Sequence, residues 1–500
     1  MDFCDSCAQF RNPPHRPRGG PAGRRGKYAG HITICRQNSQ KPAERCKLVI
    51  NAPIAQWIEH QTSNLQVAGS SPVGGACVCN RNAKEHAPKE TATAGQNFNG
   101  EYQKIAQWQT RLYRDLHRNP ELSLKEFRTA ERIEAELSRL GTRPMRIGET
   151  GVAAVIRNGT GKTVLARADI DALPVTENTA LPYASQIPGI MHACGHDMHI
   201  CALLGAVKLL LSCRSDWSGT YIALFQPAEE LAAGAEKMLA DGLREKIPAP
   251  QIAFAQHVIV GPAGQITTVS GPALSAGDSI RIVIYGRGAH GSMPHTSVDT
   301  VLLASGIVTR LHSVVSREIQ PGVFAVLTVG AINAGTKSNI IPDSAELLVN
   351  IRTYSTKVRD RIISAVERIV RGECAAAGAE REPEFTYYDH YPLTCNDKSA
   401  NEIITEKFKA YFGPQSVTAN GKGATASEDF SVIPDAYRIP YVYWFVGCTG
   451  EAQWNDALAR GSVETDIPAN HNPGFAPQIT PTLQRATEAQ AVAALAFLER

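Results

Sequence analysis

Apolar segments between residues 151 and 257 alternate with helical patterns, and polar residues follow each of them. The segments within 162–174, 220–226 and 252–256 have the length and apolar character of buried strands, and 200–212 has the pattern of a helix. Strands that alternate with helices favour an open α/β sheet, in which the carboxyl ends of parallel strands meet at one edge. The sequence therefore predicts a functional site along that edge.

The stretch MHACGHDMH, residues 191–199, concentrates metal-binding side chains. It places Cys194 between His192 and His196, and His199 follows one helical turn later. Thiolate and imidazole groups are ligands that zinc and related ions bind well. We interpret the stretch as part of a metal site. The alternative, for this stretch alone, is a buried cysteine beside histidines that cap a helix.

Three further candidate ligands follow predicted strands or turns. Glu230 and His257 each come after a predicted strand, and His471 lies in the segment ANHNPGF. With Cys194 and His196 they make five ligands, whereas one catalytic zinc normally uses three protein ligands and a water. Two ions that share a bridging thiolate would use all five. Taken singly, either His257 or His471 would more often be an ordinary core or surface histidine.

Two adjacent carboxylates, Glu229 and Glu230, follow the strand predicted at 220–226. Carboxylates are costly to bury without partners, and adjacent side chains of an extended backbone point in opposite directions. We therefore expect Glu230 to bind metal while Glu229 faces the bound water as a general base. Asp171, at the end of an earlier strand, suits an acceptor that orients a metal-bound histidine. The alternative for Glu229 and Glu230 is an acidic turn that is exposed to solvent.

A chain of 500 residues is long enough for several domains, and the pattern changes at residue 279. From there to 392 it reads strand, helix, strand, strand, helix, strand, the order of a ferredoxin-like α+β module. The later segments return to the first pattern. We predict a catalytic domain built from residues 99–278 and 393–500, with residues 279–392 inserted between its two parts.

Residues 1–98 show no sustained hydrophobic period, and we predict a disordered or artefactual extension there. Residues 52–75 resemble peptides that arise when a transfer-RNA gene is read as protein. Residues 1–95 carry thirteen Lys and Arg against six Asp and Glu, a net charge of +7, so the rest carries −4 of the total +3. A folded part without basic surplus argues against a nucleic-acid partner.

The chain also lacks signs of export or membrane insertion. The N-terminus has no apolar segment typical of a signal peptide, and no run of about 18 apolar residues occurs. The twelve cysteines follow no disulfide framework. We predict a cytoplasmic protein without a membrane partner.

Six motifs resemble those of the dinuclear metal-dependent amidohydrolases, which include aminoacylases, hippurate hydrolases and indole-acetyl-amino-acid hydrolases. They are RADIDALP, HACGHDMH, FQPAEE, GRGAHGSMPH, SNIIPD and SEDFS, and the resemblance runs from about residue 103 to the C-terminus. It implies an open zinc-peptidase-like catalytic sheet with an inserted lid or dimerisation domain, and hydrolysis of an N-acyl amino acid to a carboxylate and an amine. It also implies that Glu229 is the base and that the metal ligands are Cys194, His196, Glu230, His257 and His471.

The resemblance implies roles for the inserted domain as well. His290, in GRGAHGSMPH, matches a lid histidine that polarises the scissile carbonyl, often in the site of the partner subunit. Asn339 and Arg352 match positions that hold the carboxylate of the substrate, a bidentate task that suits arginine. We therefore expect a homodimer or a dimer-based oligomer.

Other functions are compatible with parts of this pattern. A dipeptidase, or a deacetylase of a biosynthetic N-acyl intermediate, needs the same machinery. A non-catalytic metal or amino-acid binding protein needs ligands but no base, so Glu229 argues against it. The expected cofactor is two divalent metal ions per subunit, and Zn, Mn, Co and Ni all tolerate this ligand set.

Overall fold

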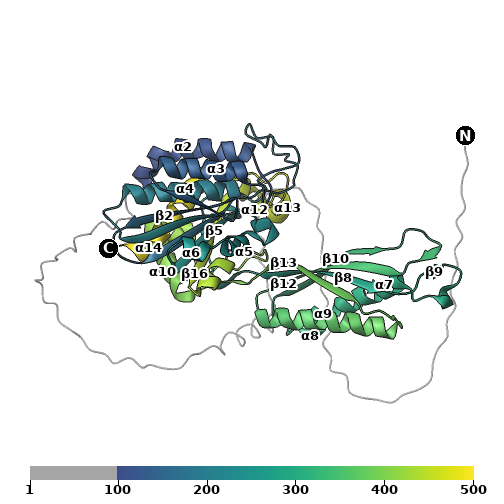
Figure 1. Ribbon diagram of the computed structural model, residues 1–500. Coiled ribbons are helices and arrows are strands. Elements are labelled where there is room, and N and C mark those ends of the chain that lie inside the picture. The colour runs from purple at the N-terminus through teal and green to yellow at the C-terminus, as the bar shows by residue number, and fades with distance from the viewer. Residues whose placement is uncertain (1–97, 500) are drawn as a thin grey trace, which may run out of the picture. The chain divides into compact units, whose positions relative to one another are not determined.

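The computed structural model describes residues 98–499, so the predicted N-terminal extension lies outside the described residues except for Phe98. A sheet of eight strands forms the centre of the larger part (Figure 1). Its strands, in spatial order, are β1 (Pro144–Ile147), β2 (Gly151–Asn158), β4 (Gly219–Gln226), β3 (Thr163–Asp169), β5 (Ile252–Pro262), β16 (Tyr441–Thr449), β6 (Ile266–Thr268) and β15 (Val417–Thr418).

The four central strands of this sheet are parallel. β3 pairs in parallel with both β4 and β5, and β5 pairs in parallel with β16. The predicted α/β class is confirmed, and the carboxyl ends of these strands meet at one edge. One predicted boundary is wrong: β5 does not stop at Gln256 but continues to Pro262, because β16 pairs with it as far as Thr449. His257 therefore projects from within a strand.

Helices cover both faces of the sheet, and alternate residues of each strand point to opposite faces. Within β4, Tyr221, Ala223 and Phe225 join one hydrophobic core, while Ile222 and Leu224 join the other. The first core is formed with α2 (Phe98–Arg118), α3 (Phe127–Arg139), α4 (His196–Ser212), α10 (Lys398–Phe412) and α14 (Ile479–Leu498). The second is formed with α5 (Gly234–Ala240), α6 (Leu243–Lys246) and α11 (Val432–Tyr437).

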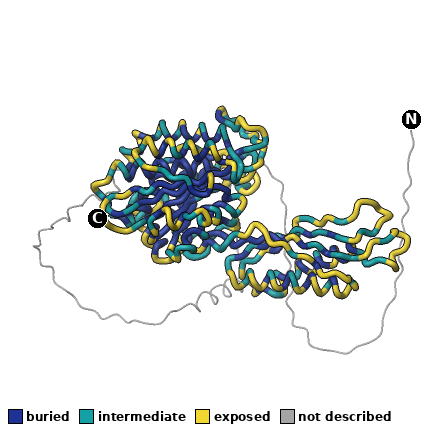
Figure 2. Tube along the Cα trace, viewed as in Figure 1, coloured by how far each residue is buried: buried dark blue, intermediate teal, exposed yellow. Residues whose placement is uncertain are grey.

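Helix α4 lies deepest in this arrangement. Nearly all of its residues are buried, and it packs against α2 and α14 as well as the sheet. Figure 2 shows the same concentration of buried chain between the outer helices. A helix that is apolar all round is stable only in such an interior. Because α4 begins at His196, its buried position fixes the start of the helix at the edge of the sheet.

A second, four-stranded sheet has its own hydrophobic core. Its antiparallel strands, in spatial order, are β10 (Ala325–Ala334), β12 (Ser344–Thr353), β8 (Ala276–Tyr285) and β13 (Glu384–Tyr391). Helices α7 (Thr300–Leu311), α8 (Ser313–Glu318) and α9 (Thr356–Ala376) pack against it. This order along the chain is the one that the sequence predicted. The domain boundaries drawn at 278/279 and 392/393 stay predictions.

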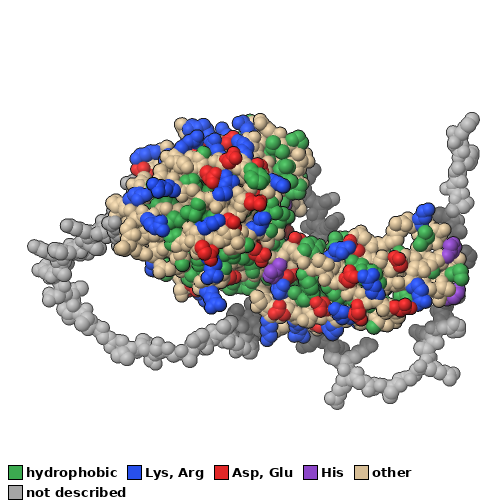
Figure 3. Space-filling view, viewed as in Figure 1, with side chains coloured by type: hydrophobic (Ala, Val, Ile, Leu, Met, Phe, Trp, Pro, Cys, Tyr) green, Lys and Arg blue, Asp and Glu red, His purple; other side chains and the backbone are tan. Residues whose placement is uncertain are grey.

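Short strands connect the two sheets. β7 (Gly271–Leu274) precedes β8, β14 (Thr394–Asn396) follows β13, and the two pair with each other in antiparallel fashion. At another point of the four-stranded part, β9 (Ala289–His290) pairs with β11 (Ile340–Ile341). On the face shown in Figure 3, basic and acidic side chains are intermixed. Among residues 98–499, no helix combines the length and apolar character needed to cross a membrane.

Candidate metal centre and active site

The structure brings together all five predicted metal ligands at the edge of the eight-stranded sheet. Cys194 Sγ lies 3.4 Å from His257 Nε2 and 3.3 Å from His471 Nε2. Glu230 Oε1 lies 3.3 Å from His471 Nε2 and 4.0 Å from His196 Nε2. Their ligand atoms therefore face a common point, with the thiol between two imidazoles. Their role as ligands stays a prediction.

The chemistry of these groups fits divalent cations. His196 Nε2 and Glu230 Oε1 are buried and have no hydrogen-bond partner among the described residues. Burial, and the nearby carboxylates Glu230 and Glu229, raise the pKa of the Cys194 thiol well above its usual value. Polar atoms without partners and a thiol among carboxylates are unfavourable in a protein interior, but a cation would satisfy all of them.

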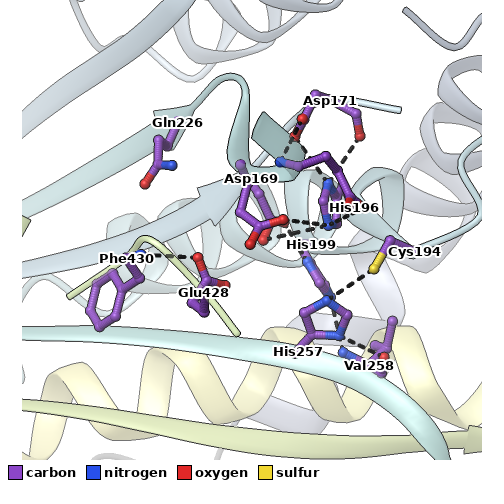
Figure 4. Close-up of polar contacts among 12 residues, drawn as sticks. Asp169, Asp171, Cys194, His196, His199, Gln226, His257, Val258, Glu428 and Phe430 are labelled. Atoms are coloured by element: carbon purple, nitrogen blue, oxygen red, sulfur yellow. Dashed lines mark hydrogen bonds and ion pairs between the residues drawn. The ribbon is translucent and has the colours of Figure 1, made fainter. Parts of the chain in front are cut away.

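The ring nitrogens that do not face the common point are held by hydrogen bonds. His196 Nδ1 lies 2.9 Å from the backbone oxygen of Asp171 and 3.2 Å from its Oδ1. His257 Nδ1 lies 2.8 Å from the oxygen of Val258. A ring that donates through Nδ1 has its Nε2 lone pair free to bind a metal. Asp171 thus lies where the sequence predicted it, against a candidate ligand (Figure 4).

His199 does not belong to the ligand set, although it lies close to it. Its Nδ1 is 2.5 Å from Asp169 Oδ1, and its Nε2 accepts a hydrogen bond of 2.9 Å from the backbone N–H of Val258. Both ring nitrogens are therefore occupied by protein groups. The third histidine of the MHACGHDMH stretch therefore packs beside the candidate ligands but has no lone pair left for a metal.

A tight approach of two chain segments shapes the metal site. Gly195, at the start of α4, has a φ of +88°, and a Cβ there would lie 2.5 Å from Val258 Cγ2. Any side chain at this position would push α4 and β5 apart. Asn470 joins the same segments, because its side-chain amide donates to the backbone oxygens of Cys194 and Val258 at 3.1 Å each. The sequence analysis missed Asn470, although it precedes His471 in ANHNPGF.

The backbone at Glu229 is not extended, so the predicted reason for its orientation is wrong. Ala228 adopts a left-handed conformation with a φ of +48°, and Glu229–Leu231 form a 3-10 turn. The turn nevertheless separates the two carboxylates. Glu230 faces His471, while Glu229 is buried near Glu428 and Asp429.

The electrostatic surroundings of Glu229 favour proton uptake. Burial, followed by the neighbouring Glu428 and Glu230 carboxylates, raises its pKa well above the usual value. A carboxylate whose pKa is raised toward neutrality is a stronger base than an exposed one. Glu229 is thus a candidate for the general base, and this role stays a prediction.

A pocket of about 420 Å³ opens beside these residues. Arg352, from β12, lines it together with Tyr391 and Ser427, and donates a hydrogen bond to the Ser427 hydroxyl. No carboxylate of the described residues forms an ion pair with Arg352. An arginine that lines a pocket without an acidic partner is suited to bind an anionic group of a ligand.

The other two residues predicted from the inserted domain do not line this pocket. His290 lies on β9, is exposed, and its Nδ1 is 2.7 Å from Ser292 Oγ. Asn339 lies beside it, since its backbone oxygen accepts a hydrogen bond from the N–H of Gly291. The structure brings His290 and Asn339 near each other but not to the pocket of the same chain.

Sequence analysis also missed a buried charged group behind the pocket. Arg167, from β3, contacts Asp169, Glu428 and Asp429 within 3.3 Å, and all four side chains are buried. The signal was available, because Arg167 opens the RADIDALP motif and the two acidic residues occupy SEDFS.

Comparisons with known proteins place the chain in a family. A family model described as peptidase family M20/M25/M40 matches residues 165–464. N-acetylcysteine deacetylase of Bacillus subtilis is 36% identical over 69% of this chain and 89% of its own length. Hippurate hydrolase of Campylobacter jejuni is 34% identical over 69% of this chain and 88% of its own.

A solved structure shares the whole described fold. It is a dinuclear metal-binding peptidase of the M20 family from Bacillus subtilis, which is 29% identical, with a TM-score of 0.64 over 79% of this chain and 99% of its own. The predicted relationship and the use of divalent metal are therefore supported by sequence, fold and ligand chemistry together. The chain belongs to peptidase family M20/M25/M40 and is a metal-dependent hydrolase.

Proposed function

We propose that this protein hydrolyses the amide bond of N-acyl amino acids to a carboxylate and a free amino acid. The observation that carries the proposal is the composition of one pocket. It combines four of the five candidate metal ligands, a buried Glu229 and an Arg352 that has no acidic partner among the described residues. An N-acyl amino acid offers the matching groups, an amide for hydrolysis and a carboxylate for the arginine. The names of the two relatives support this class of substrate.

The proposed cofactor is two divalent ions per subunit, Zn, Mn, Co or Ni, held by Cys194, His196, Glu230, His257 and His471. When bound, such ions supply an activated water and a Lewis acid for the amide carbonyl. Glu229 accepts the proton of the attacking water and then delivers it to the leaving nitrogen. Arg352 orients the substrate by binding its carboxylate, and Asp171 keeps the ring of His196 in position.

We further propose a homodimer that forms through the four-stranded sheet. Its edge strand β10 carries the exposed apolar side chains Val326 and Ile332, and Leu302 on α7 is 72% exposed. An exposed apolar edge strand offers unpaired backbone groups and apolar surface with which another chain can pair. His290 and Asn339 do not line the pocket of their own chain, which supports a role for them in the pocket of a second copy.

A cytoplasmic location is proposed with this function. The six cysteines of residues 98–499 are all free, and two of them, Cys213 and Cys395, are not buried. Free accessible thiols are typical of a reducing compartment.

The decisive test is a comparison of Glu229→Gln with the wild-type enzyme on a panel of N-acyl amino acids and dipeptides. The variant is expected to keep its metal but lose about 10² to 10⁴ in turnover, the usual contribution of a general base. Glu236→Gln, which changes an exposed glutamate seven residues away, is the matched control and should keep its activity. Near-native turnover of a metal-loaded Glu229→Gln would refute the role of the base. Cleavage of dipeptides alone would indicate a dipeptidase.

A further inference from the structure

The guanidinium of Arg167 uses all of its hydrogen-bonding capacity inside the protein. Its Nε donates to Gln226 at 3.0 Å, and its Nη1 donates to Asp169 at 2.7 Å and to Glu428 at 3.1 Å. Its Nη2 donates to Glu428 at 2.8 Å and lies 3.3 Å from Asp429. The side chain has no exposed surface. One planar group thus connects three carboxylates that come from two distant parts of the chain.

Arg167 is the one arginine or lysine that contacts Asp169, Glu428 and Asp429 in the described structure, and all three carboxylates are buried. Asp169 also contacts the rings of His196 and His199, whereas Glu428 and Asp429 pair with Arg167 alone among the described residues. Buried charge is expensive unless it is paired and hydrogen-bonded. A buried ion cluster is weak evidence for a stabilising role, so this one is a candidate for a task at the neighbouring site.

The first connection to the metal centre runs through Asp169. One of its oxygens, Oδ2, accepts from Arg167, and the other, Oδ1, lies 2.5 Å from His199 Nδ1. His199 Nε2 in turn accepts from the backbone N–H of Val258, the residue after His257. Figure 4 shows His199 between Asp169 and His257. Arg167 thereby anchors a chain of hydrogen bonds that ends at the backbone N–H next to His257, and the His199 ring in that chain packs 4.6 Å from the His257 ring, centroid to centroid.

The second connection runs through Glu428. Both of its oxygens accept from Arg167, and Oε2 also accepts from the Tyr443 hydroxyl at 2.7 Å. Glu428 lines the pocket, and its carboxylate lies within 4.8 Å of that of Glu229. Without Arg167, Glu428 would keep its hydrogen bonds from the Tyr443 hydroxyl and the Phe430 N–H but would lose the one cation that pairs with it among the described residues. The two Nη groups of Arg167 therefore hold the Glu428 carboxylate in the wall of the pocket.

We propose that Arg167 is a positioning residue, which orients His257 through Asp169 and His199 and restrains Glu428 beside Glu229. The proposal rests on the metal ligands and base assigned under the proposed function. Lysine cannot replace arginine in this task, because a single ammonium lacks the planar fork that contacts Asp169 and Glu428 together.

The test measures Mn²⁺ binding to the metal-depleted full-length chain by calorimetry, together with kcat, KM and melting temperature. Arg167→Lys is expected to bind Mn²⁺ about 10- to 100-fold more weakly, the usual effect of losing a group behind a ligand, and to lose a similar factor in kcat at saturating Mn²⁺. KM for an N-acyl amino acid should change little. Arg146→Lys is the matched control, because Arg146 makes a two-bond contact with Glu134 far from the site. It should bind Mn²⁺ like the wild type.

Each outcome separates the positioning role from a purely structural one. A lower melting temperature with unchanged Mn²⁺ affinity and kcat in Arg167→Lys would overturn the proposal, as would wild-type behaviour in every measurement. If Arg167→Lys does not fold, Asp169→Asn decides: weaker Mn²⁺ binding supports the proposal, and unchanged binding overturns it. The binding measurement needs no substrate. A wild type that binds Mn²⁺ but cleaves no N-acyl amino acid would refute the proposed function alone, and one that binds no Mn²⁺ would refute both.

Discussion

Replacing His117 by glutamine should make the stability of the protein depend less on pH. His117 ends α2, and its ring is buried between two carboxylates. Nδ1 lies 2.7 Å from Asp197 in the first turn of α4, and Nε2 lies 3.3 Å from Glu177. When each ring nitrogen faces a carboxylate, the protonated imidazole is favoured, because it can donate a hydrogen bond to both. Burial opposes protonation, but the hydrogen bonds from Asp197 and Glu177 outweigh it and raise the pKa of His117 to about 9.

The size and the pH range of the effect follow from this pKa. A rise from the ordinary 6.5 to about 9 corresponds to about 3 kcal/mol of unfolding free energy, because one pKa unit is worth about 1.4 kcal/mol. Protonated His117 favours the folded state, so the contribution is fully present below pH 6.5, declines above it and is lost as the pH rises through about 9. The gap in stability between wild type and His117→Gln should therefore be about 3 kcal/mol near pH 6 and shrink under alkaline conditions.

Urea unfolding followed by circular dichroism at several pH values, with one fixed Mn²⁺ concentration, measures this gap. His312→Gln is the control, because His312 is exposed and its replacement should leave the pH profile unchanged. A His117→Gln variant that loses the same free energy of unfolding at pH 6 and above pH 9 would refute the idea that His117 is protonated between the Asp197 and Glu177 carboxylates. The loss would then come from packing alone.

Three further experiments test other parts of the site. Cys194→Ala should lower metal occupancy and melting temperature, since metal binding is linked to folding, and full occupancy of both ions would rule out a bridging thiolate. Arg352→Met should raise KM by about 10- to 100-fold with a smaller change in kcat, as expected when a charged binding contact is lost, and an unchanged KM would remove its substrate role. Mixing inactive Glu229→Gln with inactive His290→Ala subunits should restore activity in hybrid sites, and no recovery in proven mixed dimers would exclude His290 acting across subunits.

Much of the fold was predictable because its signals are local. Apolar strands with acidic or imidazole residues directly after them, as at Asp171 and Glu230, place ligands at the edge of a parallel sheet. The four-stranded part was predictable from the order of its elements. Its edge strand and exposed apolar residues could not be predicted, since periodicity gives strands but not their neighbours.

The parts that sequence analysis missed depend on contacts between distant residues. Arg167 and Glu428 are 261 residues apart, and although each lies in a recognisable motif, neither motif indicates that the two side chains contact each other. No sequence pattern singles out His117, because its partner Asp197 lies 80 residues away. The turn at Glu229 depends on a left-handed alanine, a conformation that propensity disfavours. Such residues become recognisable only when the segments that hold them are brought together.

The pairing of β7 with β14 has a consequence for how such a protein could change over evolutionary time. The chain leaves the eight-stranded sheet and returns to it through two strands that are bonded side by side. A short turn between Leu274 and Thr394 would close them into an ordinary hairpin. The 119 residues between these positions could thus be lengthened, exchanged or removed as one cassette without changing the strand order of the eight-stranded sheet. Arg352 would leave with the cassette while Cys194 and Glu229 stayed behind, so substrate choice and bond cleavage could evolve separately in this architecture.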